Sequence, residues 1–482
     1  MTSSRRADRD GPLWQWSAVE IAAGVRERAV SATEVMAAVG ERVRAENPAV
    51  NAIVEERLES AMDDARKVDA AVSRGEPLGP LAGVPVTIKV NVDEEGWATT
   101  NGVAAFTDVI APADAPVPGN MKRAGAISIG RTNTPEFSFR ATTDNDLYGR
   151  TMNPWNDWAS AGGSSGGAAA AAMMGFGPIH HGNDIGGSLR FPAYACGAAS
   201  VKPGLGRVPA YNPSQKAERG LMAQLMSVQG VIAREVRDVR LGLEALVAPD
   251  PRDPFHVPLP LAGPPEAAQR VGYTDDALGF DLDPSVARAL ETAAAALADA
   301  GYVVERVAPP LVKETAELGY RCLFGEMKAL MDADIRRLGS ETLVRIFDQY
   351  YDAFQPFEGE ELLRAMAERT RYARAWSEFQ ARYPLTLTPF LFKPTYANDA
   401  DVPRAGGPPF SDTLGAAHYS FAFNFLGLPA GIIPADLNEG LPVGVQLVGR
   451  RWREDLVLDA IEAIEARVGV MAEALWARRG EA

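Results

Sequence analysis

The chain has 482 residues, of which 46% are hydrophobic and 23% are charged, a composition typical of a globular protein with a large buried core. Lys and Arg number 48 against 63 for Asp and Glu, so the net charge is -15. A chain this acidic repels phosphate backbones and anionic lipid surfaces, which argues against nucleic acid or a membrane as a partner.

The cysteine content argues against a disulfide-rich protein, and the N-terminal sequence argues against an exported one. Cys196 and Cys322 are the only cysteines, too few for a disulfide framework, and one bridge between them is not indicated. No Cys/His cluster suggests a metal site, and we expect no metal and no cofactor. The N-terminus lacks the apolar run of a signal peptide, and no stretch of about 20 apolar residues could span a bilayer. The cytoplasm is therefore the expected location.

The first elements that the sequence predicts are helices, over residues 13–72. Two Ser-x-x-Glu sequences, at 17–20 and 31–34, fit the capping box in which side chains satisfy the open amide groups of a helix start. Apolar residues then recur at three- and four-residue spacing from Val35 onward. We expect these helices to pack on the core or against a second copy of the chain in a homodimer.

Strands and helices alternate after this segment. Strand-like sequence occurs at 83–90 and 126–130, with a short helix between them. The glycine-rich segment 162–167 precedes the alanine run 168–172, which is a good helix former, and a short apolar piece follows near Ile179. The alternation is typical of an α/β protein.

The second half of the chain continues the alternation. A strand at 270–274, a helix at 284–300 capped by Gly301 and a strand at 302–307 predict a helical crossover between parallel strands. Residues 312–382 are helical and rich in aromatics, and a strand at 441–449 and a helix at 455–468 end the chain. The Pro-rich stretch 249–265 predicts a loop on the surface and not a domain boundary.

Three segments carry the candidate chemistry: Lys89, Gly162-Gly163-Ser164-Ser165-Gly166-Gly167 and Gly182-Asn183-Asp184-Ile185-Gly186-Gly187-Ser188. Each is weak alone. A lysine in a strand is usually a solvated edge residue, and the Gly/Ser hexapeptide lacks the Lys-Ser/Thr ending of a phosphate-binding loop. Ser188 could simply cap the helix that follows it.

Together these segments resemble the amidase signature hydrolases, and the resemblance covers nearly the whole chain. The most specific feature is the spacing of 24 residues between Ser164 and Ser188. The remaining matches are spread along the sequence, at Asn51-Ala52, Gly83-Val84-Pro85, 130–137, Asn153-Pro154-Trp155, 190–193, Cys196-Gly197, Lys202-Pro203 and 441–446.

The resemblance implies an α/β fold with one large, mostly parallel mixed sheet covered by helices on both faces. It implies a single domain over 1–482, with an N-terminal helical segment (1–75), a catalytic core (76–230) and a variable substrate-binding region (312–410). The activity that it implies is hydrolysis of a small-molecule amide.

The resemblance also implies the roles of the site residues. Ser188 would be the nucleophile and would form an acyl-enzyme, while Ser164, after a cis peptide bond from Gly163, would relay its proton to an uncharged Lys89. The backbone N–H groups of Ile185, Gly186 and Gly187 would form the oxyanion hole.

The chemistry makes a specific demand on Lys89. A serine hydroxyl is a poor nucleophile until a base takes its proton, and Ser-Lys sites are a known variant of the serine triad. Lysine titrates near 10.4 in water, so a base near pH 7 needs a pKa lowered by about 3, or about 4–5 kcal/mol. Val84, Val86, Ile88 and Val90 supply apolar surroundings. We expect Asp93 and Glu94 to face away from the amine.

Three positions depart from the family pattern. Asn183 stands where Thr or Ser is more usual, so that a hydroxyl able to support Ser165 or the oxyanion turn becomes an amide. Ala168 replaces a Ser after the glycines, and Gly204 replaces a Thr after Lys202-Pro203. None of these changes removes a catalytic group.

Three other functions remain as alternatives. A Ser-His-Asp hydrolase would need one of His180, His181, His256 or His418, but no Gly-x-Ser-x-Gly elbow surrounds Ser188. A glutaminase subunit of an amidotransferase would need a polar pocket and a docking face. A catalytically inactive binding protein is disfavoured because all three catalytic residue types are present.

The aromatic residues of the variable region favour a small hydrophobic or aromatic amide as substrate. About two thirds of them are expected to be core residues and the rest to line the pocket; they are Phe324, Phe347, Tyr350, Tyr351, Phe354, Phe357, Tyr372, Trp376, Phe379, Phe390 and Phe392. Linear amides, anilides, hydrazides, cyclic amides and esters all remain compatible with acyl-enzyme chemistry.

Overall fold

The computed structural model describes residues 11–266, 269–403 and 417–481. Its described strands form one eleven-stranded mixed sheet in the order β1-β3-β2-β4-β6-β5-β10-β11-β9-β7-β8. The strands are β1 Ile53–Glu56, β2 Pro85–Lys89, β3 Ile127–Thr132, β4 Ile179–Asp184, β5 Ala199–Lys202, β6 Val228–Ala233, β7 Arg270–Tyr273, β8 Val303–Arg306, β9 Leu385–Thr388, β10 Ala430–Asn438 and β11 Leu441–Gly449.

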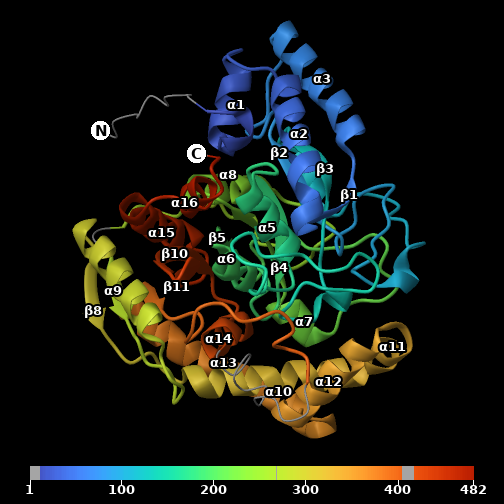
Figure 1. Cartoon of the computed structure of the whole chain (residues 1–482). Coiled ribbons are helices and arrows are strands. Elements are labelled where there is room, and N and C mark those ends of the chain that lie inside the picture. Colours follow the sequence, from blue (N-terminus) through green and yellow to red (C-terminus); the bar gives the residue numbers. More distant parts are fainter. Residues whose placement is uncertain (1–10, 267–268, 404–416, 482) are drawn as a thin grey trace.

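Helices surround this sheet (Figure 1). Helices α8, α9 and α15 pack side by side on the central strands, while α5 and α6 pack together on the same strands within a second hydrophobic cluster. The helices are α1 Ala18–Arg26, α2 Ala32–Val50, α3 Leu58–Arg74, α4 Pro116–Arg123, α5 Gly166–Met174, α6 Arg190–Cys196, α7 Leu221–Met226, α8 Val236–Leu246, α9 Pro284–Asp299, α10 Val312–Leu330, α11 Asp332–Leu338, α12 Glu341–Phe354, α13 Gly359–Arg382, α14 His418–Leu426, α15 Glu454–Val468 and α16 Met471–Arg478.

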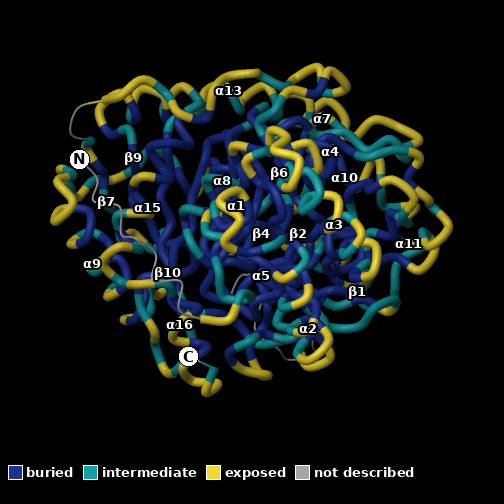
Figure 2. The backbone as a smooth tube through the Cα atoms, turned by 90° about the horizontal axis from the view of Figure 1, so that it is seen from above, coloured by how far each residue is buried: buried dark blue, intermediate teal, exposed yellow. Residues whose placement is uncertain are grey.

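Burial follows this layering. Figure 2 shows buried backbone through the middle of the molecule and exposed residues along the outer turns of peripheral helices such as α13 and α3. Cys196 and Cys322 are both buried and free. Within the described ranges, no helix has the length and apolar character needed to cross a bilayer.

The locally encoded elements are confirmed. Both capping boxes form: the Ser17 and Ser31 side chains each accept from the backbone N–H three residues on, and each serine's own N–H donates to the Glu carboxylate there. Strands β7 and β8 pair in parallel across α9, which is the predicted crossover. Gly301 follows α9 with a φ of 94°, one residue beyond the C-cap Ala300.

The α/β class and the single large sheet are confirmed, but the prediction of a mostly parallel sheet is wrong. Parallel pairing is confined to β2 with β3 and β4, and to β7 with β8 and β9, whereas the other described pairs are antiparallel. One cause is the hairpin β10–β11, whose two turn residues Glu439 and Gly440 have φ of 50° and 79°, as a type I′ turn requires.

The topology brings three chain segments to one place. Strands β2 and β4 are parallel neighbours, so their carboxyl ends meet at the same edge of the sheet. Lys89 is the last residue of β2, and Asp184 is the last residue of β4. Helix α5 begins directly after Ser164 and Ser165, and it packs against β2 and β4.

Candidate active site

Lys89 lies at the centre of the site. Its side chain is 0% exposed, and its Nζ lies 2.8 Å from Ser164 Oγ, 3.1 Å from Ser165 Oγ and 2.8 Å from Asn183 Oδ1. Burial lowers the pKa of Lys89 well below its ordinary value of 10.5, and the charge of Asp184 opposes this shift only partly. The amine therefore has the environment that a neutral base needs.

The two acidic residues that follow β2 do not contact this amine. The carboxylate of Asp93 accepts hydrogen bonds from Thr99 and Ser214, and Glu94 pairs with Arg57 at 2.8 Å. The prediction that both face away from Lys89 is confirmed.

Ser164 follows a cis peptide bond from Gly163 and is buried. The glycines before it are required by close packing. A Cβ on Gly163 would lie 2.2 Å from the carbonyl oxygen of Arg140, and Gly162 has a φ of 77° with the backbone of Pro192 beside it. Ser165 stands at the N-cap of α5 but makes no capping bond; its Oγ instead accepts a hydrogen bond from Lys89 Nζ at 3.1 Å.

Ser188 lies in the turn between β4 and α6 and is half-buried. It lines a cavity of about 410 Å³ together with Ser164 and Asn183. The structure thus brings Ser164, Ser188 and Lys89 to one location.

The turn before Ser188 contains the predicted oxyanion donors. The N–H of Gly187 donates to Asp184 Oδ1 at 2.7 Å. Among the described residues, no acceptor lies opposite the N–H groups of Ile185 and Gly186, and Ile185 lines the cavity. This geometry favours Ile185 and Gly186 over Gly187 as donors to an oxyanion.

A buried charged cluster holds this turn. Asp184 pairs with Arg190 at 3.0 Å, and Arg190 donates to Gln446 Oε1 on β11 at 2.8 Å. Asn424 of α14 donates to Asp184 Oδ1 at 2.8 Å. Burial raises the pKa of Asp184, but Arg190, Lys202 and the Asn424 amide together outweigh this effect and hold the pKa below its ordinary value. Asn424 had no sequence signal, because it contacts the turn from 240 residues away.

The histidines nearest in sequence are not placed as general bases. His181 accepts from the Lys89 backbone N–H through Nδ1, so its Nε2 carries the hydrogen and donates to Gln229 Oε1 at 2.9 Å. The Thr87 hydroxyl and the Gly177 carbonyl occupy both ring nitrogens of His180. Burial lowers the pKa of each histidine to about 3. Neither ring is free to activate Ser188.

The cavity has an apolar wall and a polar wall. Phe137, Phe139 and Ile185 line it together with Leu323 and Met327 of α10. The polar wall includes the amide and hydroxyl side chains of Asn91, Asn101, Ser138 and Asn183, and charged side chains also line the cavity, namely Glu218, Arg219 and Glu326.

The expectation for the aromatics of the variable region is wrong in one respect. None of the eleven expected residues, all within the described ranges, lines this cavity. Several pack on one another instead, such as Phe324 on Phe354 with ring centroids 5.2 Å apart, because large apolar rings gain more from burial in a core. Phe137, Phe139 and Tyr211 supply the aromatic lining.

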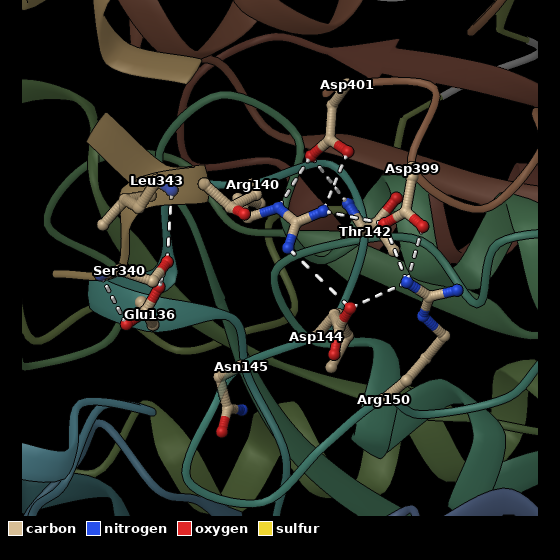
Figure 3. A network of polar contacts seen from close by, with 12 residues as sticks. Glu136, Arg140, Thr142, Asp144, Asn145, Arg150, Ser340, Leu343, Asp399 and Asp401 are labelled. Atoms are coloured by element: carbon tan, nitrogen blue, oxygen red, sulfur yellow. Dashed lines mark hydrogen bonds and ion pairs between the residues drawn. The ribbon is translucent and has the colours of Figure 1, made fainter. Parts of the chain in front are cut away.

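A network of ion pairs supports the loop behind Gly163 (Figure 3). Arg140 pairs with Asp401 and Asp399, both at 3.2 Å, and Arg150 joins Asp399 to Asp144. Asp401, which is 0% exposed, also accepts from the backbone N–H of Ala141 at 3.1 Å. The network ties segment 399–401 to the loop whose carbonyl packs on Gly163.

Replacing Asp401 by asparagine should destabilise the protein by about 3–5 kcal/mol, because it leaves the buried Arg140 guanidinium without its buried counter-charge. The measurement is the urea unfolding midpoint. The matched control is Asp348→Asn, which breaks an exposed ion pair with Arg336 and should cost less than about 1 kcal/mol. Equal shifts in the two variants would show that the network does not hold the loop.

Among the described residues, no group of three or more His, Cys, Asp or Glu side chains is arranged to hold a metal ion.

Known proteins resemble this chain over most of its length. The family described as Amidase matches residues 34–458. An indoleacetamide hydrolase of Bradyrhizobium diazoefficiens is 44% identical over 467 residues, covering 97% of this chain and 89% of the relative. One subunit of the glutamyl-tRNA(Gln) amidotransferase of Moorella thermoacetica is 32% identical, covering 94% and 96%. The crystal structure of a bacterial aryl acylamidase of the amidase signature family aligns with a TM-score of 0.83 and 28% identity, covering 96% and 98%.

Proposed function

The chain belongs to the Amidase family and is an amide hydrolase, and we propose that Ser188 attacks the amide carbonyl with Ser164 as proton relay and Lys89 as base. The observation that carries this proposal is the buried Lys89 amine with its lowered pKa, 2.8 Å from Ser164 Oγ. In this proposal residues 76–230 supply all three catalytic groups, and the region 312–410 supplies part of the apolar wall of the cavity through α10.

The proposed reaction begins with proton transfer. Ser188 Oγ attacks the carbonyl carbon while its proton passes to Ser164 Oγ, and the Ser164 proton passes to the Lys89 amine. The N–H groups of Ile185 and Gly186 stabilise the oxyanion, an interaction whose loss typically costs about 10²–10³-fold in rate.

The tetrahedral intermediate then collapses. The C–N bond breaks, and the leaving nitrogen receives the proton from the Lys89 ammonium through Ser164. The acyl group remains as an ester on Ser188. Water attacks this ester along the same proton path and releases the carboxylic acid, so that one amide and one water give one acid and one amine.

We propose a small aromatic amide as the substrate. The support is the apolar wall that includes Phe137, Phe139 and Met327, together with the 44% identity to an indoleacetamide hydrolase. Burial of a ring of 150–250 Å² contributes about 4–6 kcal/mol at 25 cal/mol per Å² before ordering costs are subtracted.

Glutamine is the second candidate. Its ammonium and carboxylate would need charged partners, and Glu218 and Arg219 line the cavity. The relative from Moorella thermoacetica also favours this candidate.

A hydrolysis panel separates the two candidates. Indoleacetamide, phenylacetamide, acetanilide, acetamide and glutamine are compared at equal enzyme concentration. We expect kcat/KM for the aromatic amides to exceed that for acetamide and glutamine by about 100-fold, because a buried ring contributes a few kcal/mol of selective binding. A kcat/KM for glutamine equal to or above that for the aromatic amides would overturn the proposed substrate class.

A further inference from the structure

The amine of Lys89 has three hydrogen-bonding neighbours, and it can act as a base toward Ser164 only if its lone pair faces that residue. A neutral primary amine offers two N–H bonds and one lone pair. Asn183 Oδ1 can only accept a hydrogen bond, so it takes one N–H. Ser165 Oγ accepts the second N–H, and its own hydroxyl points to the Asn183 main-chain carbonyl at 3.4 Å. The lone pair is thereby left for the third neighbour, Ser164.

A chain of hydrogen bonds sets which end of the Asn183 amide faces Lys89. Asn183 Nδ2 donates to Asn91 Oδ1 at 2.9 Å, which turns Oδ1 toward the amine. Asn91 Nδ2 donates to Ser138 Oγ at 2.9 Å, and Ser138 donates to Asn101 Oδ1 at 2.6 Å. If the Asn183 amide were flipped, two carbonyl oxygens would face one another at Asn91.

The far end of this chain is held by an unusual backbone. Asn101, Phe137 and Ser138 have φ of 49°, 53° and 62°, a region that non-glycine residues adopt uncommonly. Such backbone conformations persist only where the surrounding structure enforces them, and they are found most often at functional sites. Here they place the Ser138 hydroxyl and the Asn101 amide on the polar wall of the cavity.

We infer, resting on the proposed function, that Asn183 is a positioning residue for the base: its side-chain carbonyl fixes one N–H of Lys89, so that the lone pair points at Ser164. The amide thus does more than replace the hydroxyl that is usual at this position. It connects the catalytic amine to the wall of the substrate cavity through Asn91 and Ser138.

The charged groups around Lys89 determine what a carboxylate at position 183 would do to its protonation. Asp184 at the end of β4 is its charged neighbour of opposite sign, while Arg131 of β3 donates to the Lys89 carbonyl at 3.4 Å and His181 of β4 is neutral. The serines contributed by α5 and the segment before it are uncharged. A carboxylate at position 183 would place an anion within hydrogen-bond distance of the amine. The charged side chains that line the same cavity are Arg219, Glu218 and Glu326.

The decisive experiment is the pH profile of kcat/KM for Asn183→Asp, which preserves the shape of the side chain. We expect its acid limb to move up by about 1–3 pH units, because an adjacent carboxylate favours the protonated amine. Activity at pH 7 should fall about 10- to 1000-fold and recover as the pH is raised. The matched control is Asn156→Asp on an exposed turn, whose limb should coincide with that of the wild type.

A second variant, Asn183→Leu, removes the acceptor without adding charge. Its plateau kcat should fall about 10-fold with KM unchanged, because the lone pair loses its orientation, and its limb should not move upward. If the Asn183→Asp limb coincides with the wild-type limb, or if Asn183→Leu keeps the wild-type plateau, Asn183 does not position the base. Should Asn183→Leu fail to fold, Asn183→Asp decides alone.

The failure of this inference is distinguishable from failure of the proposed function. The acid limb must first be shown to belong to Lys89, by its absence from the residual activity of Lys89→Met. A limb that persists in Lys89→Met would overturn the proposed base and the role of Asn183 with it. A limb that belongs to Lys89 but does not move in Asn183→Asp would overturn the role of Asn183 alone.

Discussion

Replacing Ser188 by alanine should lower kcat/KM by about 10⁴- to 10⁶-fold, the range seen when the nucleophile of a serine hydrolase is removed. The physical reason is that no covalent acyl intermediate can form, while the oxyanion donors and the cavity remain. Ser188 is half-buried in a turn, so we expect the thermal midpoint of unfolding to stay within about 2 °C. Initial rates on an aromatic amide measure the first effect.

Covalent labelling provides the second readout for Ser188. A fluorophosphonate should modify the wild type once, at Ser188, and should leave Ser188→Ala unmodified. The control is Ser73→Ala on the exposed surface of α3, which should keep both the rate and the label. Substantial turnover by Ser188→Ala, or a label on another serine, would show that the nucleophile is a different residue.

Replacing Lys89 by methionine should lower kcat by about 10²- to 10⁴-fold, the usual contribution of a general base. In the wild type the neutral amine is the active form, so kcat/KM should rise with pH through the lowered pKa of Lys89 and then level off. The limb should be absent from the residual activity of Lys89→Met. A variant that keeps the wild-type rate would exclude Lys89 as the base.

The same substitution has an expected effect on stability. Between the lowered pKa of Lys89 in the folded protein and its ordinary value of 10.5, the unfolded chain binds a proton that the folded protein does not. Raising the pH through this window therefore stabilises the wild type relative to Lys89→Met. Urea midpoints of both proteins at several pH values measure the difference, and a gap that does not change with pH would contradict a buried neutral amine.

A second buried lysine offers a matched control. Burial lowers the pKa of Lys202 to about 7, and its Nζ donates to the Pro203 carbonyl at 2.9 Å without contacting either serine. Lys202→Met should change the pH dependence of stability in the same direction as Lys89→Met. It should keep the acid limb of kcat/KM, because Lys89 remains in place.

Elements defined by neighbouring residues could be predicted from the sequence. The capping boxes at Ser17 and Ser31 and the β7–α9–β8 crossover depend on short stretches of chain, and the structure has them as expected. The proximity of Lys89 and Ser164 could be predicted only from the family resemblance. Taken alone, the sequence around each residue is equally typical of an edge strand or a loop.

Features that depend on distant partners could not be predicted. The pairing of β5 with β6 and β10 has no local signature, because the direction of a strand depends on the whole chain path. Composition alone predicts that about a third of the aromatics of the variable region line the cavity, whereas the choice between core and cavity depends on how α10 and α12 pack. The contact between Asn183 and Lys89 could not be predicted either. It depends on the orientation of the Asn183 amide, which is set by Asn91 at the end of the neighbouring strand β2.

The buried charged cluster that holds the nucleophile turn has a consequence for the protein during its synthesis. Arg190 follows Ser188 by two residues, but its partner Gln446 lies 256 residues further along the chain. At about 5–20 residues per second, the ribosome needs roughly 10–50 s to make that intervening segment. A nascent chain therefore contains Lys89, Ser164 and Ser188 long before Gln446 is available to bind Arg190 beside the turn that carries Ser188. We therefore expect amide hydrolysis to begin only after β11 has been made and Gln446 has reached Arg190.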